Sequence, residues 1–303
     1  MFEQERISRR GFFKVGAAGA AAAIVAARNP LALAGEPEAG GKKVPIPTGL
    51  QLYSVREDCG KDLPGVIAAV AKMGYKGVEF AGYYGRDSKT LRKMLDDNGI
   101  VCCGTHIGFD TIWGANLDKT VEFNQTLGNK FLIVPGMGAK TKLDWLGKAE
   151  QFDEVADKLK PLGMWCGYHN HSAEFKEIDG EKPWDTFFGN TKKDVVMQFD
   201  IGNAMGGGGN FVEYVKKYPG RALTIHVKPW SKSKPKAVIG EDDLPWKEIF
   251  ELCETIGGTK WYIVEYEVGG VPALRPSTSA SRASRRWARR SESGGAPKQQ
   301  RCA

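Results

Sequence analysis

The sequence lacks the short motifs that would point to a zinc finger, a disulfide framework or a bound nucleotide. It has six cysteines but no Cys-x-x-Cys pair, and Cys102 and Cys103 are neighbours, so a zinc finger and a set of disulfides are both disfavoured. No glycine-rich phosphate-binding fingerprint follows the first strand-like run, and glycines 206–209 are not followed by Gly-Lys-Ser/Thr. These absences disfavour a nucleotide-binding doubly wound sheet, and we interpret glycines 206–209 as a flexible loop.

Excess positive charge is absent from the body of the chain. The formal net charge is +7, yet residues 270–303 alone hold seven Arg and one Lys against one Glu, and residues 1–35 hold five basic and two acidic side chains. The 234 residues between them carry 30 basic and 33 acidic groups. A slightly acidic body does not suit a polyanion. We therefore expect no nucleic-acid partner, and a nuclease is disfavoured.

No apolar run near the N-terminus is long enough to span a bilayer. Arg9 and Arg10 precede two aromatic residues, a lysine and the thirteen apolar residues of Val15–Ala27, and a small-residue cleavage signal follows at Ala32–Ala34. This pattern resembles a twin-arginine (Tat) export signal. We predict a signal peptide over residues 1–34 and a linker over 35–44.

The export signal implies a location and a set of contacts. It predicts that the Tat machinery exports the protein to the periplasm or another extracytoplasmic space. Thirteen mildly apolar residues do not hold a protein in a bilayer, so no stable membrane insertion is expected after cleavage. Because Tat carries folded proteins, often with a metal loaded, the signal is also compatible with a cofactor.

The middle of the chain alternates between short apolar, strand-like runs and amphipathic helical stretches. Apolar positions at i, i+3 and i+4 predict the helices, and strand–helix units repeated about every thirty residues predict a parallel sheet. Eight units close a (β/α)8 TIM barrel, which we place at residues 45–268. The predicted strands are 49–55, 77–81, 101–107, 131–135, 165–171, 195–200, 223–228 and 261–267, and the predicted helices are 63–73, 88–98, 117–127, 148–159, 211–217 and 246–256.

The C-terminal segment 269–303 does not continue this pattern. From Arg275 onwards Trp287 is the one large apolar residue, and the rest is dense in Arg, Ser, Ala and Gly, which predicts a disordered basic tail. We hypothesise that a frameshift replaced the last barrel helix. A basic tail for nucleic acid or anionic lipid is the alternative. A missing helix would expose an apolar stripe on the barrel and favour a homo-oligomer.

The chemistry-bearing side chains gather at the predicted strand ends. All four histidines lie there, together with Glu79, Asp200, Glu265 and Glu267. The carboxyl ends of barrel strands meet at one mouth, and imidazoles with carboxylates there predict a divalent-metal site. Alternation places two further pairs on shared faces, namely His169 with His171 and His226 with Lys228.

An ordered set of motifs makes the sequence similar to a known family. The motifs are Gly49–Arg56, Gly77–Phe80, Gly167–His171, Phe199–Asn203, His226–Lys228 and Ile263–Glu267. They resemble the xylose-isomerase-like barrels, identified as sugar phosphate isomerases/epimerases. The resemblance implies metal ligands on strands five to eight, here His169, Asp200, His226 and Glu265. His169 stands where many members have Glu, and Pro229 stands where an Asp is common. The first departure leaves the metal open among Mn²⁺, Zn²⁺, Co²⁺ and Fe²⁺.

The resemblance also implies a reaction on a small sugar. A metal-held keto-sugar would lose a proton beside its carbonyl to give an enediolate, and reprotonation would isomerise or epimerise it. We assign catalytic roles to His106, Glu79, Lys228 and Glu265. Substrate-binding residues are expected to be Tyr53, His171, Trp113 and Trp230. The alternatives are a lyase or dehydratase acting on an oxidised glycoside, and a barrel that binds sugar without catalysis.

Overall fold

The computed structural model describes residues 45–267, which form a closed barrel of eight parallel strands. Each strand pairs with the next, and β1 pairs with β8 to close the ring. The predicted fold class is thereby confirmed. The strands are β1 (Thr48–Gln51), β2 (Gly77–Ala81), β3 (Val101–His106), β4 (Phe131–Val134), β5 (Trp165–His169), β6 (Val196–Asp200), β7 (Thr224–Val227) and β8 (Trp261–Val264).

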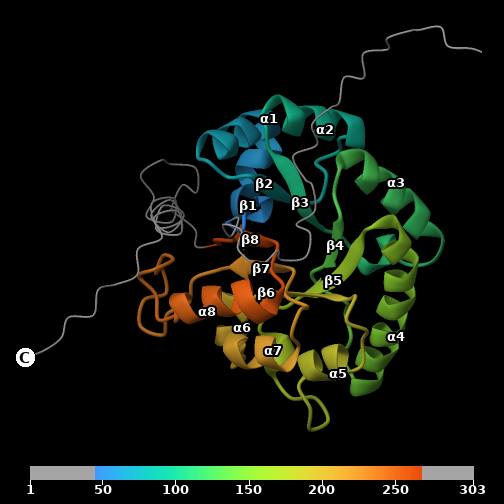
Figure 1. The fold of residues 1–303 in the computed structure, drawn as a ribbon, viewed down its shortest axis with the longest axis vertical. Helices are drawn as coiled ribbons and strands as arrows, with labels where there is room; N and C mark the ends of the chain where they lie inside the picture. The colour runs from blue at the N-terminus through green and yellow to red at the C-terminus, as the bar shows by residue number, and fades with distance from the viewer. Residues whose placement is uncertain (1–44, 268–303) are drawn as a thin grey trace, which may run out of the picture. The chain divides into compact units, whose positions relative to one another are not determined.

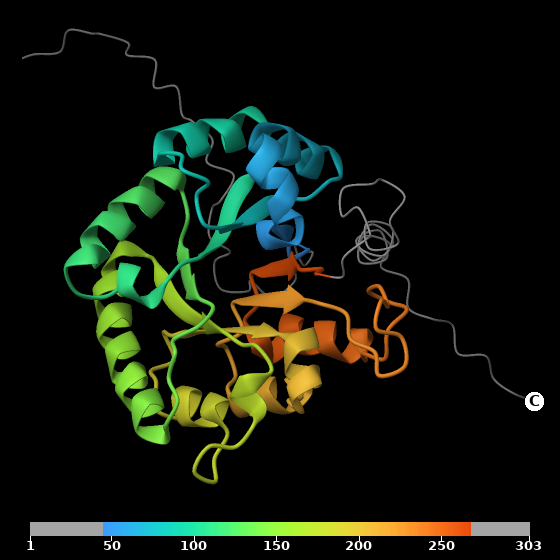
Figure 2. The ribbon, with the colours of Figure 1, turned by 180° about the vertical axis from the view of Figure 1, so that it is seen from behind.

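Helices surround the strands as an outer layer (Figures 1 and 2). They are α1 (Arg56–Lys72), α2 (Ser88–Asp97), α3 (Leu117–Leu127), α4 (Lys142–Leu159), α5 (Pro183–Gly189), α6 (Ile201–Gly207), α7 (Phe211–Lys217) and α8 (Trp246–Leu252), which a π-helical turn extends over Cys253–Gly257. The 3-10 turns are Leu52–Val55, Phe109–Thr111, Gly114–Asn116, Lys160–Leu162 and Ala173–Phe175. The six predicted helices all exist, whereas α5 and α6, each seven residues long, were not predicted.

Three strands end at least two residues earlier than the sequence predicts. Residues Leu52–Val55 form a 3-10 turn because the Gln51 side chain accepts a hydrogen bond from the backbone of Tyr53 and caps that turn. The predicted β5 includes His171, but the strand ends at His169. The predicted β8 includes Glu267, but the strand ends at Val264. His171 and Glu267 therefore lie outside the strands, and strand alternation does not determine the direction of their side chains.

An irregularity in β3 changes which of its side chains face inward. Its pairing with β2 joins Val78 to Cys102 but Glu79 to Gly104, so one residue is left over at Cys103. A bulge of this kind shifts the alternation of a strand by one position. Cys103 packs in an interior apolar cluster, while a Cβ at Gly104 would lie 2.5 Å from the Glu79 carboxylate. The shift brings His106 to the inward face.

The barrel interior has an apolar floor and a polar layer above it. The floor is a separate cluster of Cys103, Phe131, Ile133, Val196, Trp261 and Ile263. Because residues two apart on a strand share a face, Val196 on the floor is followed by Gln198 and then by Asp200. Ile263 is likewise followed by Glu265. The inward direction of the floor residues thus also fixes the inward direction of Gln198, Asp200 and Glu265, which lie nearer the mouth.

Glycines 206–209 do not form the open loop that the sequence predicts. Gly206 and Gly207 lie in α6, and Gly208 caps it in the left-handed region at φ 87°. A Cβ at Gly207 would collide with the backbone of Ser172, and one at Gly209 would meet Phe175 at 2.5 Å. The run is glycine because α6 packs tightly on the segment after β5.

Several predictions fall outside the described residues. The signal peptide, most of the linker, the basic tail with its proposed frameshift, and any helix after β8 belong to residues 1–44 or 268–303. They stay predictions. Within residues 45–267, no helix combines the length and apolar character needed to cross a membrane.

Arg221 provides a test of the fold away from the barrel mouth. Its guanidinium is buried and donates hydrogen bonds to the carbonyl oxygens of Phe188, Thr191 and Val195 and to the Thr191 hydroxyl. We expect Arg221→Met to lower the free energy of unfolding by about 3 kcal/mol, because two buried carbonyl groups and one part-buried carbonyl group lose their donor. Urea unfolding measures this loss. Arg92→Met, which removes an exposed ion pair with Asp96, should change stability by less than about 1 kcal/mol; equal effects would refute the argument.

Candidate metal centre and active site

Four potential ligands meet at the carboxyl ends of β5 to β8. His169 ends β5, Asp200 ends β6, His226 lies on β7 and Glu265 directly follows β8. All four are buried, and their ligand atoms lie within 4.8 Å of one another. These are the four residues that the family resemblance implies as metal ligands.

Asp200 carries the clearest sign that a cation belongs here. Its Oδ1 accepts a hydrogen bond from the backbone N–H of Asn203 at 2.7 Å and caps α6. Its Oδ2 is buried and has no hydrogen-bond partner, and burial raises the pKa of Asp200 to about 7. The nearest charges, His226 Nδ1 at 3.8 Å and Lys228 Nζ at 3.9 Å, lie beyond hydrogen-bond distance, and a buried carboxylate oxygen without a hydrogen bond is costly. A divalent cation would satisfy it, and two imidazoles with two carboxylates are a suitable donor set.

His226 lies between two carboxylates. Its Nε2 is 2.6 Å from Glu79 Oε2, and its Nδ1 is 2.5 Å from Glu265 Oε2. Burial acts to lower the pKa of His226, but the charge of Glu79 and the hydrogen bond with Glu265 outweigh it and raise this pKa to about 10. Because Glu79 occupies Nε2, Nδ1 is the nitrogen that His226 can offer to an ion.

Glu265 and Lys228 complete the charged rim of this group. Burial acts to raise the pKa of Glu265, but His226 and Lys228 hold it below its ordinary value. The Lys228 ammonium lies 3.3 Å from Glu265 Oε1 and also binds Glu267. Burial acts to lower the pKa of Lys228, yet Asp200 and Glu265 raise it. Lys228 therefore stays charged, which suits a hydrogen-bond donor better than a base.

His106 is the one predicted proton-transfer group that combines a neutral state with access to the mouth. Its ring centroid lies 4.6 Å from that of His169 and 5.2 Å from that of His226. Its side chain is 11% exposed. Burial lowers the pKa of His106 and holds that of His169 well below the ordinary value, so both rings are neutral imidazoles near pH 7.

Glu79 lies deeper than the sequence assignment supposes. It is completely buried and accepts hydrogen bonds of 2.7 Å from the side-chain amides of Gln51 and Gln198. Burial acts to raise its pKa, but His106 and His226 hold that pKa below its ordinary value. Both carboxylate oxygens already bind side chains of the polar layer, including His226 at 2.6 Å, so its position suits anchoring His226 rather than contacting a substrate.

The sequence reasoning missed two glutamines of this layer. Gln51 and Gln198 are both fully buried. The available signal for Gln198 was its place two residues before Asp200, which puts it on the same face of β6. Gln51 ends β1 beside Glu79.

The predicted substrate-binding residues lie on segments that follow strand ends. Tyr53 is 42% exposed in the turn after β1. His171 is exposed after β5, with its ring centroid 5.2 Å from that of His169. Trp113, half-buried after β3, stacks on Phe109, and Trp230 follows β7 beside Gly206. Among these four, His171 is thus the residue in ring contact with a candidate ligand.

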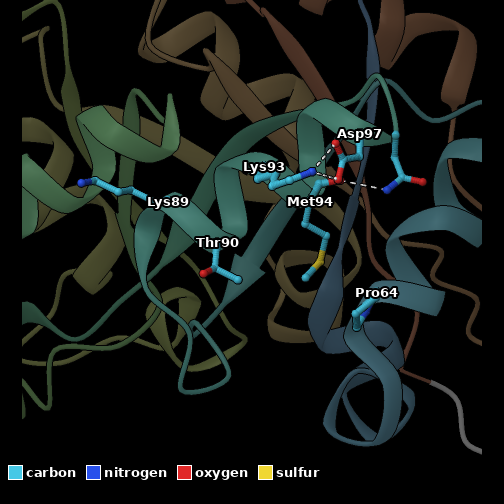
Figure 3. A pocket seen from close by; sticks show the side chains of 7 residues that line it. Pro64, Lys89, Thr90, Lys93, Met94 and Asp97 are labelled. Carbon is cyan, nitrogen blue, oxygen red and sulfur yellow. Dashed lines mark hydrogen bonds and ion pairs between the residues drawn. The ribbon is translucent and has the colours of Figure 1, made fainter.

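A groove of about 470 Å³ lies elsewhere, between α1 and α2 in the outer helix layer (Figure 3). Pro64 of α1 lines one side, and α2 supplies Lys89, Thr90, Lys93, Met94 and Asp97. The Lys93 ammonium is already paired with Asp97 at 2.7 Å. Because exposed lysines and a methionine do not form a catalytic set, the chemistry is better sought at the barrel mouth.

The family model of the xylose isomerase-like TIM barrel matches residues 67–291. The chain belongs to this family.

The chain is similar to curated proteins named inosose dehydratase. It is 23% identical over 248 residues to the one from Serratia proteamaculans and 24% identical over 243 residues to the one from Histophilus somni; each match covers 66% of this chain and 81% of the relative. Among solved structures, it is similar to a sugar phosphate isomerase/epimerase from Parabacteroides distasonis, with a TM-score of 0.69 and 24% identity, covering 82% of this chain and 97% of that one.

Proposed function

We propose that this protein is a metal-dependent enzyme that removes a proton beside the carbonyl of a keto-sugar and returns it elsewhere, as an isomerase or epimerase. The buried oxygen of Asp200 that accepts no hydrogen bond, beside His169, His226 and Glu265, is the observation that carries the proposal. A divalent ion held by these four residues would polarise the carbonyl and acidify the neighbouring C–H bond.

The surrounding residues supply the remaining roles. His106 accepts the proton, because its ring is neutral and partly exposed beside the ligands. Lys228 donates a hydrogen bond to the oxygen on which negative charge develops. Glu79 holds His226 in place. Tyr53, His171, Trp113 and Trp230 would contact the sugar, and export through the Tat pathway would put the reaction in the periplasm.

Dehydration is the second candidate, favoured by the relatives named inosose dehydratase. It begins with the same proton abstraction. The C–O bond to a hydroxyl on the next carbon then breaks, and the hydroxyl leaves as water with a proton. The two reactions differ in the fate of the substrate after its C–H bond has broken.

Proton NMR in D₂O tests the proposal and separates the two reactions. The purified protein, loaded with Mn²⁺, Zn²⁺, Co²⁺ or Fe²⁺ and then freed of excess metal, is incubated with a ketohexose or with inosose. Deuterium at a carbon of an isomerised sugar supports the isomerase or epimerase, whereas stoichiometric loss of water supports the dehydratase.

His106→Gln provides the matched variant for this assay. It should retain metal while deuterium incorporation falls by about 10²–10⁴-fold, the usual contribution of a general base. Absence of exchange with every metal and both sugars would overturn the proposal and favour a barrel that only binds sugar.

A further inference from the structure

We propose that Gln198 is a positioning residue that determines which ring nitrogen carries the proton in His169 and, together with the Glu79 carboxylate 3.3 Å from His106 Nε2, in His106. The proposal rests on the proposed metal-dependent function only where it says which ring nitrogen binds the metal and which accepts a proton. The protonation pattern of the two rings can be measured without metal or substrate.

The Gln198 side chain is completely buried in the polar layer and uses both ends of its amide. Its Oε1 lies 2.7 Å from His106 Nε2 and 3.1 Å from His169 Nδ1. Its Nε2 lies 2.7 Å from Glu79 Oε1 and 3.0 Å from the Thr224 hydroxyl. One amide therefore touches two imidazoles and the carboxylate that anchors a third.

Glu79 sets the orientation of this amide. Glu79 accepts a hydrogen bond from the Gln51 amide and lies 2.6 Å from His226 Nε2, and an ionised carboxylate only accepts hydrogen bonds. The NH₂ end of Gln198 must therefore face Glu79, because the reversed amide would place two acceptors 2.7 Å apart. Its carbonyl oxygen, which can accept two hydrogen bonds, then faces His106 and His169.

The orientation of the amide sets the tautomer of His169 and, together with Glu79, that of His106. A carbonyl oxygen requires N–H donors, so His169 is protonated at Nδ1 and His106 at Nε2. A neutral imidazole that carries its proton on one nitrogen keeps a lone pair on the other. His169 can then offer Nε2 to an ion, and His106 can accept a proton at Nδ1.

Long-range ¹H–¹⁵N correlation NMR of the metal-free protein reads these tautomers directly. We expect Nδ1–H for His169 and Nε2–H for His106. In Gln198→Met the His169 ring should populate both tautomers, while His106 should keep the preference that Glu79 imposes from 3.3 Å. The affinity for Zn²⁺, measured by competition with a chelator, should fall by about 10–100-fold. Gln51→Met is the matched control, since it also removes a buried amide bonded to Glu79 but leaves the carbonyl that faces the rings.

The wild-type spectrum alone can overturn the proposal, even if Gln198→Met does not fold. His169 protonated at Nε2 in the wild-type protein would refute it, as would an unchanged His169 tautomer in a folded Gln198→Met. The same loss of tautomer order in Gln51→Met would assign the effect to Glu79 instead. The expected tautomers in a protein without any turnover would refute the proposed function and leave this inference standing.

Discussion

Asp200→Asn is expected to weaken the binding of Zn²⁺ or Mn²⁺ by at least about 100-fold and to abolish turnover. Removing a residue that hydrogen-bonds to a metal ligand already lowers metal affinity by about 10–100-fold. Asp200→Asn removes the charge of a ligand itself. The amide oxygen of Asn can still accept the hydrogen bond from Asn203, so the cap of α6 survives. Metal analysis after dialysis measures the binding.

Asp87→Asn is the matched control for this experiment. Asp87 caps α2 by accepting a hydrogen bond from the backbone of Thr90 at 2.9 Å, which is the role that Asp200 plays for α6. The control should keep its metal and its activity. Stoichiometric metal in Asp200→Asn would contradict the assigned site.

Glu79→Leu is expected to lower the free energy of unfolding by about 3–5 kcal/mol, the usual cost of removing one partner from a buried charge pair. The variant leaves His226 charged with one carboxylate fewer and leaves the amides of Gln51 and Gln198 without their acceptor. Chemical denaturation of the metal-free protein measures the loss.

A comparison with Glu181→Leu shows whether Glu79 anchors His226 or takes part in catalysis. Glu181→Leu removes an exposed carboxylate that pairs with Lys142 and should cost about 1 kcal/mol or less. If Glu79 were instead a proton-transfer group at the mouth, Glu79→Leu would fold as stably as the wild type and lose only turnover.

The barrel itself was predictable because its signals are local and repeated. Apolar β-rich runs alternate with amphipathic helices, and glycines such as Gly128 end helices in the left-handed region. The strand order follows from parallel pairing between successive units. The start of α4 was missed by six residues, although Thr141 and Asp144 form a capping box at its first turn.

The candidate ligands were predictable by type and resemblance, but their surroundings were not. The inward direction of His106 depends on the bulge at Cys103, which strict alternation does not contain. The early end of β5 takes His171 out of the strand. The role of Gln198 depends on contacts with residues 92, 29 and 119 positions away, which no local pattern encodes.

The position of His226 between Glu79 and Glu265 bears on the order of assembly. In the metal-free protein this imidazolium acts as an internal counter-ion: its stabilising effect is complete below pH 6.5 and is lost as the pH rises through about 10. Zinc fingers, by contrast, are unfolded until metal binds. We therefore expect this barrel to fold without metal and to bind a divalent ion afterwards, exchanging one proton of His226 for the metal.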